Sequence, residues 1–218
     1  VVDDAAKNYP VAEELTEPAF YPVTEDPALP RVLLIGDSIS IGYTVPVREL
    51  LRGKANVLRI PVNGGPTTRG VAMLDAWLGG GKWDVIHFNW GLHDIKRVRD
   101  GKTDIRADWQ VGPEMYRANL ETLAGKLKET GARLIWAATT PVPEGAGGRV
   151  KGDEVRANTI AAEVMEKHGI AVNDLHGHVL PVLGEYQRPA NVHFTDAGSA
   201  FLAQRVAAAI LGALEEGI

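Results

Sequence analysis

Five short runs rich in apolar and β-branched residues alternate along the chain with segments of helical period. The runs span Arg31–Ile35, Asn56–Pro61, Trp83–Asn89, Arg133–Ala138 and Ile170–Val172. In the helical segments apolar residues recur at intervals of three and four, and these segments span Val45–Arg52, Thr68–Leu78, Pro113–Thr130, Gly152–His168 and Asp196–Glu216. This alternation predicts an α/β fold in which helices cover both faces of a parallel sheet.

The length of the chain favours a single domain. Its 218 residues, of which 45% are hydrophobic and 23% charged, suffice for one sizeable core but not for two. Residues 1–30 contain several prolines and acidic residues and have no clear helical or strand period. We therefore expect an extended N-terminal arm over residues 1–30 and one domain over residues 31–218.

Composition excludes several classes of function. The formal charge is −5 and the lysines and arginines are scattered, which argues against a nucleic acid or an anionic membrane as partner. No uninterrupted apolar stretch is long enough to span a bilayer, so we expect no membrane insertion. The chain has no cysteine, which excludes disulfides, a thiol nucleophile and thiolate metal sites.

The compartment and the oligomeric state are not determined by the sequence. Val1 is not an initiator methionine, so we expect a processed or trimmed N-terminus, which is compatible with export. A secreted or periplasmic location is favoured over a cytoplasmic one.

A serine stands where the first predicted strand ends. Gly36-Asp37-Ser38-Ile39 directly follows the apolar run, which places Ser38 at the start of the next helix, where free backbone N–H groups favour negative charge. A serine nucleophile needs a base to take its proton and donors to hold the developing oxyanion. Taken alone, the segment is more typical of an ordinary helix cap than of a nucleophile, and the other motifs reverse that preference.

A histidine that could act as this base lies near the C-terminus. His193 is in the segment Pro189–Thr195, which contains proline and polar residues and precedes the last predicted helix, so we expect an exposed loop. Two further loops, Leu92–Gly112 and Thr140–Gly148, follow predicted strands at their carboxyl ends. Ligands of open α/β sheets bind at that edge.

Two more segments complete a recognisable set. Asn63-Gly64-Gly65-Pro66-Thr67-Thr68 follows the second strand and Asn89-Trp90-Gly91-Leu92-His93-Asp94 follows the third. Together with Ser38 and His193 they resemble, in order and spacing, the four sequence blocks of the SGNH hydrolases, also called GDSL esterases. The resemblance extends from about Arg31 to the C-terminus. It implies a flavodoxin-like three-layer α/β/α sandwich around a five-stranded parallel sheet.

The resemblance also implies roles for individual residues. Ser38 takes the place of the family's nucleophile and His193 that of its base. The backbone N–H groups of Ser38 and Gly65 take the places of two oxyanion donors. Asp37 and Asp94 are expected to bind loop N–H groups or to position neighbouring side chains.

The chain departs from the family pattern in its third block. The block normally reads Gly-x-Asn-Asp, whereas here it is Gly91-Leu92-His93-Asp94, with a histidine in place of the oxyanion-donating asparagine. A neutral imidazole N–H can make the same donation, so we expect His93 to be the third donor. The alternative is that His93 is bonded only within its loop and that Asn89 or a backbone group donates.

A second departure concerns the acid of the triad. In the family it lies three residues before the histidine, and here that residue is Ala190. Asn191, or a backbone carbonyl in residues 188–191, could accept from the Nδ1–H of the imidazole and so set its tautomer without a charge. A Ser–His dyad is therefore the leading mechanism. Asp196 is expected to cap the last helix with Thr195 rather than to join a triad.

The sequence as a whole predicts a serine esterase that hydrolyses short-chain carboxylic esters through an acyl-serine intermediate. The expected substrate is a small acylated molecule, in the first place a carbohydrate with O-acetyl groups, and no cofactor or metal is expected. A metal site of His87, His93 and Asp94 is discounted because nothing in their spacing gives a tetrahedral set. The alternative function is a non-catalytic carbohydrate-binding protein on a decayed esterase fold, suggested by the missing acid and the altered asparagine.

Overall fold

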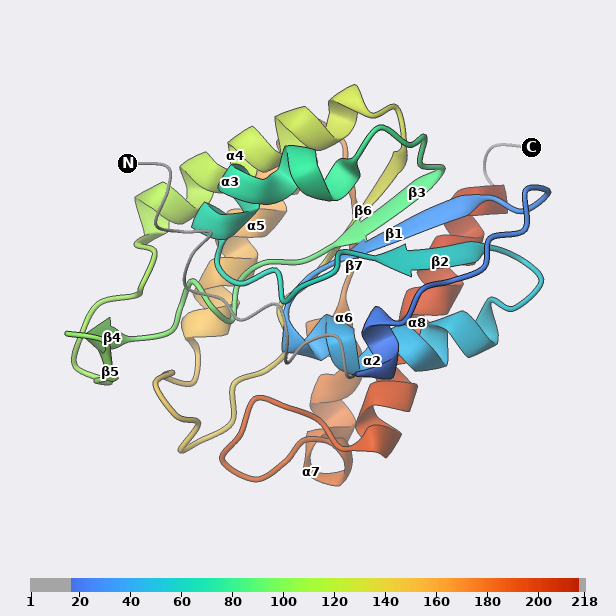
Figure 1. Ribbon diagram of the computed structural model, residues 1–218. Helices are drawn as coiled ribbons and strands as arrows, with labels where there is room; N and C mark the ends of the chain where they lie inside the picture. The colour runs from blue at the N-terminus through green and yellow to red at the C-terminus, as the bar shows by residue number, and fades with distance from the viewer. Residues whose placement is uncertain (1–16, 216–218) are drawn as a thin grey trace.

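The computed structural model describes residues 17–215, which form a five-stranded sheet covered by helices (Figure 1). The strands are β1 (Arg31–Ile35), β2 (Asn56–Arg59), β3 (Val85–Phe88), β6 (Arg133–Ala137) and β7 (Ala171–Asn173). Their order is β2-β1-β3-β6-β7 and every neighbouring pair is parallel. The central strands β1 and β3 are buried on both faces, which explains why they read as continuous apolar runs.

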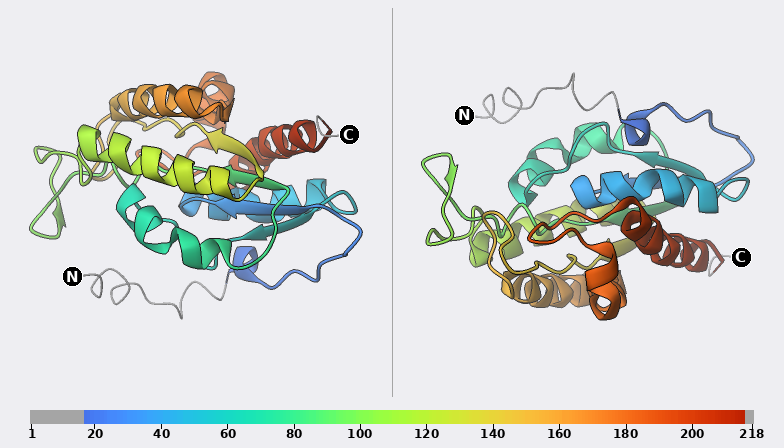
Figure 2. Two further views of the ribbon diagram at one scale, coloured as in Figure 1. Left: turned by 90° about the horizontal axis from the view of Figure 1, so that it is seen from above. Right: turned by 90° about the horizontal axis from the view of Figure 1, so that it is seen from below.

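Helices lie on both sides of the sheet (Figures 1 and 2). One layer contains α3 (Thr67–Leu78), α4 (Pro113–Glu129) and α5 (Asp153–His168), and the other contains α2 (Ser38–Leu50) and α8 (Asp196–Glu215). The predicted three-layer α/β/α sandwich with a five-stranded parallel sheet is thus confirmed. The strands all end at one edge, and the first, second and third sequence blocks leave the sheet there.

The helix after β1 starts at Ser38, as the Gly-Asp-Ser segment predicted. The helical period indicated only Val45–Arg52, the later part of this helix, which contains Pro46 in its interior. The β-branched and glycine-containing start of this segment has low helix propensity, which burial of Ile39, Tyr43 and Val47 overrides.

Short elements lie in a segment that was predicted as a loop and in another that was left unassigned. The charged segment 92–112 holds an antiparallel pair, β4 (Val98–Arg99) and β5 (Lys102–Thr103). Between β7 and α8 lie α6 (Leu175–Val179), η2 (Leu180–Val182) and α7 (Leu183–Tyr186). These elements are too short to give a detectable hydrophobic period.

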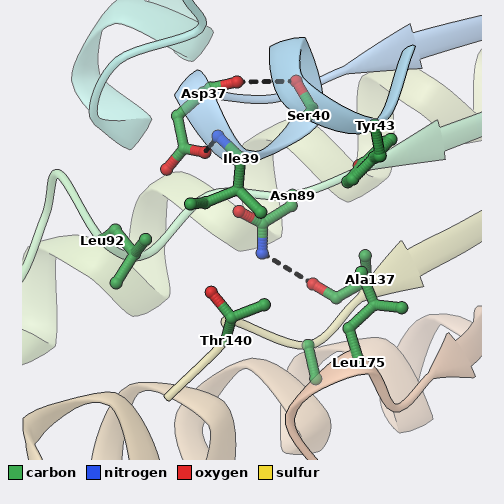
Figure 3. A pocket seen from close by; sticks show the side chains of 10 residues that line it. Asp37, Ile39, Ser40, Tyr43, Asn89, Leu92, Ala137, Thr140 and Leu175 are labelled. Atoms are coloured by element: carbon green, nitrogen blue, oxygen red, sulfur yellow. Dashed lines mark hydrogen bonds between the residues drawn. The ribbon is translucent and has the colours of Figure 1, made fainter. Parts of the chain in front are cut away.

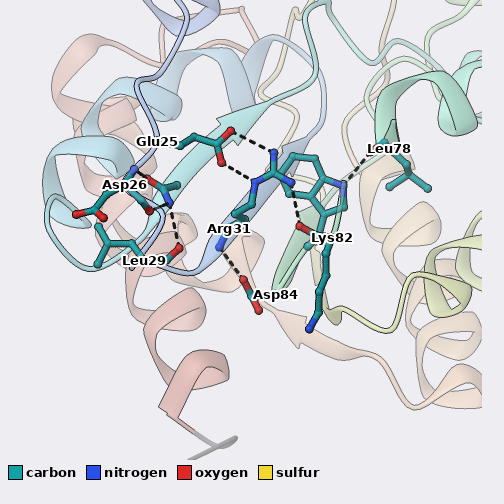
Figure 4. A network of polar contacts seen from close by, with 9 residues as sticks. Glu25, Asp26, Leu29, Arg31, Leu78, Lys82 and Asp84 are labelled. Carbon is teal, nitrogen blue, oxygen red and sulfur yellow. Dashed lines mark hydrogen bonds and ion pairs between the residues drawn. The ribbon is translucent and has the colours of Figure 1, made fainter. Parts of the chain in front are cut away.

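The described part of the N-terminal arm is fastened to the edge of the sheet where the strands begin (Figure 4). The Asn56 side chain accepts from the Asp26 N–H at 2.8 Å and donates to the Asp26 and Leu29 carbonyls. Glu25 pairs with Arg31, whose backbone N–H donates to Asp84 at 2.8 Å. Residues 18–20 form a short 3₁₀ turn, η1 (Pro18–Phe20). Residues 1–16 of the expected arm lie outside the described residues, and the division into arm and domain stays a prediction.

Helix α8 is an exception to the expectation that no segment is long and apolar enough to span a bilayer. Within residues 17–215 it is the one helix whose length and apolar composition would let it cross a bilayer. In the fold it instead packs against α2 and the sheet through a buried face that includes Leu202, Val206 and Ile210.

Candidate active site

Ser38 is the first residue of α2, immediately beyond β1. Asp37 caps the helix, since its side chain accepts from the Ile39 N–H at 2.9 Å (Figure 3). The Gly64 N–H donates to the Gly36 carbonyl at 2.9 Å, and a Cβ on Gly64 would lie 2.9 Å from that same oxygen. The first and second sequence blocks therefore touch at backbone distance, which only glycine allows.

Ser38 and His193 meet across the edge of the sheet. The Ser38 Oγ lies 2.8 Å from the His193 Nε2, and both side chains are half-buried. His193 is on the loop between α7 and α8, which is closed by a bridge between Gln187 and Phe194. The Gln187 side chain also donates to the Pro141 carbonyl at 2.7 Å, so the loop is tied to the segment after β6.

Asn191 partners the other nitrogen of this imidazole. Its Oδ1 lies 2.7 Å from the His193 Nδ1 and 3.0 Å from the His193 backbone nitrogen. A backbone N–H can only donate, so the atom facing it is the amide oxygen and not the amide nitrogen. The Nδ1 facing that same oxygen must then carry the proton. His193 is thereby held in the tautomer whose Nε2 can accept the proton of the Ser38 hydroxyl.

Ala190 and Asp196 take no part in this chain of hydrogen bonds. Ala190 has a φ of 50°, a left-handed conformation, and no acidic group. Asp196 is the exposed first residue of α8, and within residues 17–215 no hydrogen bond joins it to His193. The helix is capped by Thr195, whose Oγ1 accepts from the Gly198 N–H at 3.1 Å, rather than by Asp196.

The surroundings of His193 favour its neutral form. Burial lowers the pKa of the imidazole, and the positive charges of Arg149 and Arg188 lower it further, while Asp37 opposes them. A neutral Nε2 is what a base needs before it accepts a proton.

Gly65 is one of the expected oxyanion donors. Gly65 has a φ of 60°, and its N–H donates to the Asn63 Oδ1 at 3.0 Å. The Asn63 side chain must turn away before this N–H can meet an oxyanion.

The two alternatives for the third donor differ in their contacts. The Asn89 amide donates to the Ala137 carbonyl at 2.6 Å and lies 3.4 Å from the Thr139 hydroxyl, so it joins the ends of β3 and β6 (Figure 3). The half-buried His93 imidazole has no hydrogen bond to another described residue. Burial lowers its pKa, Asp37 opposes this, and Arg149, Lys96 and His193 add to the lowering. A neutral and uncommitted ring N–H favours His93 over Asn89 as the donor.

Asp94 links the third block to the second. Its Oδ1 accepts from the Thr67 N–H at 2.8 Å and from the Thr67 hydroxyl at 2.5 Å. Thr67 is the first residue of α3, so the carboxyl group supplies the helix with an acceptor at its N-terminus. Burial raises the pKa of Asp94 to about 7, although the two bonds from Thr67 oppose this shift.

Arg149 lies close enough to the candidate site for its charge to lower the pKa of both His93 and His193, but it was not singled out from the sequence. It follows the glycine-rich segment 140–148, and its Nε donates to the Leu92 carbonyl at 2.7 Å, next to His93. The same loop is held by the Arg97 N–H, which donates to the Gly148 carbonyl, and by an ion pair between Arg97 and Asp153. The sequence signal that could have indicated Arg149 was the position of its loop, which follows the carboxyl end of β6. Only the folded arrangement identifies which of its residues faces the site.

Two cavities adjoin the Ser38 region. A small one of about 10 Å³ lies behind Asp37 among the side chains of Ser40, Tyr43 and Thr140 (Figure 3). A larger one of about 300 Å³ has Ser38 and His193 in its wall. Its remaining lining residues are Glu17, Ile39, Ile41, Gly42, Arg188, Phe194, Asp196 and Ser199.

Comparison with known proteins relates this arrangement to one family. The model of the GDSL-like lipase/acylhydrolase family matches residues 34–201. No curated protein is similar enough in sequence to match.

Solved structures share the fold at low sequence identity. A lipase/acylhydrolase from Enterococcus faecalis is 20% identical with a TM-score of 0.71, covering 84% of this chain and 96% of its own. The acetyl xylan esterase AlAXEase is 15% identical with a TM-score of 0.68, covering 83% and 99%. An acetylxylan esterase from Geobacillus stearothermophilus is 18% identical with a TM-score of 0.66, covering 81% and 92%.

Proposed function

The chain belongs to the GDSL-like lipase/acylhydrolase family, and from that premise we propose that it is a serine esterase that removes short acyl groups, foremost O-acetyl groups, from a carbohydrate. The observation that carries the proposal is the hydrogen-bonded series Ser38–His193–Asn191, with 2.8 Å between Ser38 Oγ and Nε2 and 2.7 Å between Nδ1 and Asn191 Oδ1.

The first half-reaction transfers the acyl group to the enzyme. Ser38 Oγ attacks the ester carbonyl carbon while its proton passes to the His193 Nε2. The tetrahedral intermediate then breaks its bond to the alcohol oxygen, which takes the proton from His193 and leaves. In the second half-reaction His193 takes a proton from water, the hydroxide attacks the acyl-Ser38, and the proton returns to the Ser38 oxygen as the carboxylic acid departs.

Asn191 performs the orienting part of the usual acid's role. In serine proteases an asparagine in place of the acid costs about 10⁴-fold in turnover because it selects the wrong tautomer. Here the His193 backbone N–H holds the Asn191 oxygen toward Nδ1, which supports the productive tautomer. What a neutral partner cannot supply is a negative charge to stabilise the imidazolium.

The oxyanion is assigned to three donors. The Ser38 N–H lies in the first turn of α2, where backbone N–H groups have no partner within the helix. The Gly65 N–H joins it once the Asn63 side chain turns away, and the His93 imidazole is the third.

The preference for a small acyl group on a hydrophilic carrier rests on the surroundings of the site. The segment 92–112 forms a charged antiparallel pair of strands instead of a long apolar lid. The larger cavity combines four charged or polar side chains with a few apolar ones, and the four are those of Glu17, Arg188, Asp196 and Ser199. The acetylxylan esterases of similar fold are compatible with this choice.

The test is acetate release from a panel of acetylated polysaccharides and from 4-nitrophenyl acetate. We expect Ser38→Ala to lower turnover by about 10⁴- to 10⁶-fold, as loss of an activated serine does in other hydrolases. Thr159→Ala, which removes an exposed hydroxyl on α5, is the matched control and should keep full activity.

A fluorophosphonate that labels activated serines separates the enzyme from a binding protein. Labelling of wild type and not of Ser38→Ala supports the proposal. Acetate release that does not need Ser38, or a folded wild type that neither labels nor hydrolyses any ester, would overturn it.

A further inference from the structure

The 300 Å³ cavity contains polar side chains that the hydrolytic steps leave unused. Arg188 lies on the loop that precedes His193, and Asp196 and Ser199 lie in the first turn of α8. They surround a space whose wall also includes Ser38 and His193. Whatever occupies this space lies beside the reacting atoms.

The chemistry of acyl transfer indicates which part of the ester belongs there. His193 gives its proton to the departing alcohol oxygen, so that oxygen must be next to Nε2. The proposed oxyanion donors Gly65 and His93 are not among the residues that line this cavity, whereas Ser38 and His193 are. The alcohol part of the ester therefore extends from Ser38 along the His193 side, where the cavity opens.

The polar groups in the cavity are free to meet a ligand. Among residues 17–215, no ion pair or side-chain hydrogen bond joins Arg188 to Asp196 or occupies either of them. The Ser199 hydroxyl is likewise uncommitted within that range. A guanidinium that donates and a carboxylate that accepts, both in one cavity, match the hydroxyl groups of a sugar, each of which is donor and acceptor.

The volume of the cavity limits the size of the occupant. About 300 Å³ is at the small end of ligand pockets in proteins. This is room for a single ring rather than for a long acyl chain. Ile39 and Ile41 supply an apolar wall against which a ring can pack.

We propose that this cavity is the alcohol-side subsite, that it binds one hydroxyl-bearing glycosyl ring, and that Arg188 and Asp196 determine specificity by hydrogen bonding to free hydroxyls of that ring. The proposal rests on the esterase function and adds to it the residues that distinguish a sugar ester from a simple ester.

The test compares two substrates on the same enzymes. One is a singly acetylated methyl xylopyranoside, which keeps two free hydroxyls, and the other is 4-nitrophenyl acetate, which has none. We expect Arg188→Met and Asp196→Asn each to lower the ratio of kcat/KM values, glycoside over aryl ester, by about 10- to 100-fold, mainly through KM. Assays at pH 8 keep His193 neutral in every variant, because loss of Arg188 removes a charge that lowers its pKa.

The matched control is Arg205→Met, which neutralises an exposed arginine farther along α8 and should leave the ratio unchanged. A ratio that stays within twofold of wild type in both Arg188→Met and Asp196→Asn would overturn the subsite. So would an equal fall for both substrates. A thousandfold loss on both substrates in folded Asp196→Asn would instead assign Asp196 to the hydrolytic steps.

Failure of the subsite is distinguishable from failure of the esterase. If wild type hydrolyses the aryl ester through Ser38 but both variants keep the wild-type ratio of kcat/KM values, the proposal of the subsite alone is wrong. If no ester is hydrolysed, the subsite is tested by ligand-observed NMR with methyl xylopyranoside. Saturation transfer that disappears in Arg188→Met supports it, and no transfer to wild type refutes it.

Discussion

The two sides of Ser38 differ in how completely their hydrogen bonds are formed. On the base side, Asn191, His193 and Ser38 are joined in series, with each group in its working tautomer or orientation. On the oxyanion side, the Gly65 N–H is taken by Asn63 and the His93 ring donates to no described residue. In the proposed mechanism the base is therefore oriented before the substrate binds, whereas the proposed oxyanion donors have still to be aligned.

This difference follows from what each side must do. A base needs one fixed tautomer at all times, and a short loop closed on itself can provide it. Oxyanion donors act mainly in the transition state, and a donor that must first leave another partner, as the Gly65 N–H must leave Asn63, contributes less than a donor that is already aligned. Variants on both sides should therefore lower kcat, but by different amounts and with different substitutions that restore it.

The largest effect is expected on the base side, at Asn191. Replacing Asn191 with alanine removes the acceptor of the Nδ1–H, frees the imidazole to change tautomer and should lower kcat by about 10²- to 10⁴-fold. Asn191→Asp keeps an acceptor and should retain most of the activity. Its negative charge favours the imidazolium, so the acidic limb of the pH profile should move to higher pH.

Steady-state kinetics and the melting temperature of each variant check this prediction. If Asn191→Ala is folded and keeps wild-type kcat, the neutral partner has no orienting role.

On the oxyanion side, His93→Ala should lower turnover by about 10²- to 10³-fold, the usual effect of removing one donor. His93→Asn should recover much of it, since an amide N–H can replace the imidazole N–H. The effect belongs in kcat, because the donor acts in the transition state. Equal losses of turnover in the two variants would mean that the His93 ring packs within its loop and does not donate to the oxyanion.

Arg149 lowers the pKa of both His93 and His193, and the effect of its charge on His193 should be visible in the pH dependence of kcat/KM. Because burial, Arg149 and Arg188 lower the pKa of His193, kcat/KM should rise with pH along a limb below the ordinary histidine value of about 6.5. Arg149→Met removes one of these cations and should move the limb to higher pH. Arg156→Met, which neutralises a cation that stacks on Trp109, is the control and should leave it in place. If the acidic limb of the kcat/KM profile is unchanged in Arg149→Met, the charge of Arg149 does not affect the pKa of His193.

The smallest effect on activity is expected for a substitution of Asp94. This substitution should instead change how the free energy of unfolding depends on pH. Its pKa of about 7 lies above that of an unfolded aspartate, so between about pH 4 and 7 the folded state holds a proton that the unfolded state has lost. The free energy of unfolding therefore falls as pH rises through this range, by at most about 1.4 kcal/mol per pH unit for one proton.

Asp94→Asn should remove this part of the slope while an amide oxygen still accepts from Thr67. Urea denaturation at several pH values measures it. Identical slopes in wild type and variant would show that the Asp94 carboxyl does not titrate in this range.

Local sequence patterns determined most of the fold. The five strands were predicted within a few residues, because each run is short and rich in β-branched or apolar residues, and the central runs of β1 and β3 are buried on both faces. The helical period alone began seven residues late, at Val45 instead of Ser38, since the opening turn of α2 depends on packing against the sheet rather than on propensity. The short helices between β7 and α8 gave no period to detect.

The spacing of the four blocks likewise indicated that Ser38, Gly65, His93 and His193 gather at one edge of the sheet, because parallel strands carry their ends to the same place. The tertiary structure alone decided how they are connected. Asn191 was one of several possible partners of His193, and it is selected by where the loop directs its amide oxygen. The roles proposed for Arg149 and Arg188 depend on loops that are brought together from far apart in the chain. Side-chain direction across such distances is a property of packing, which no local pattern encodes.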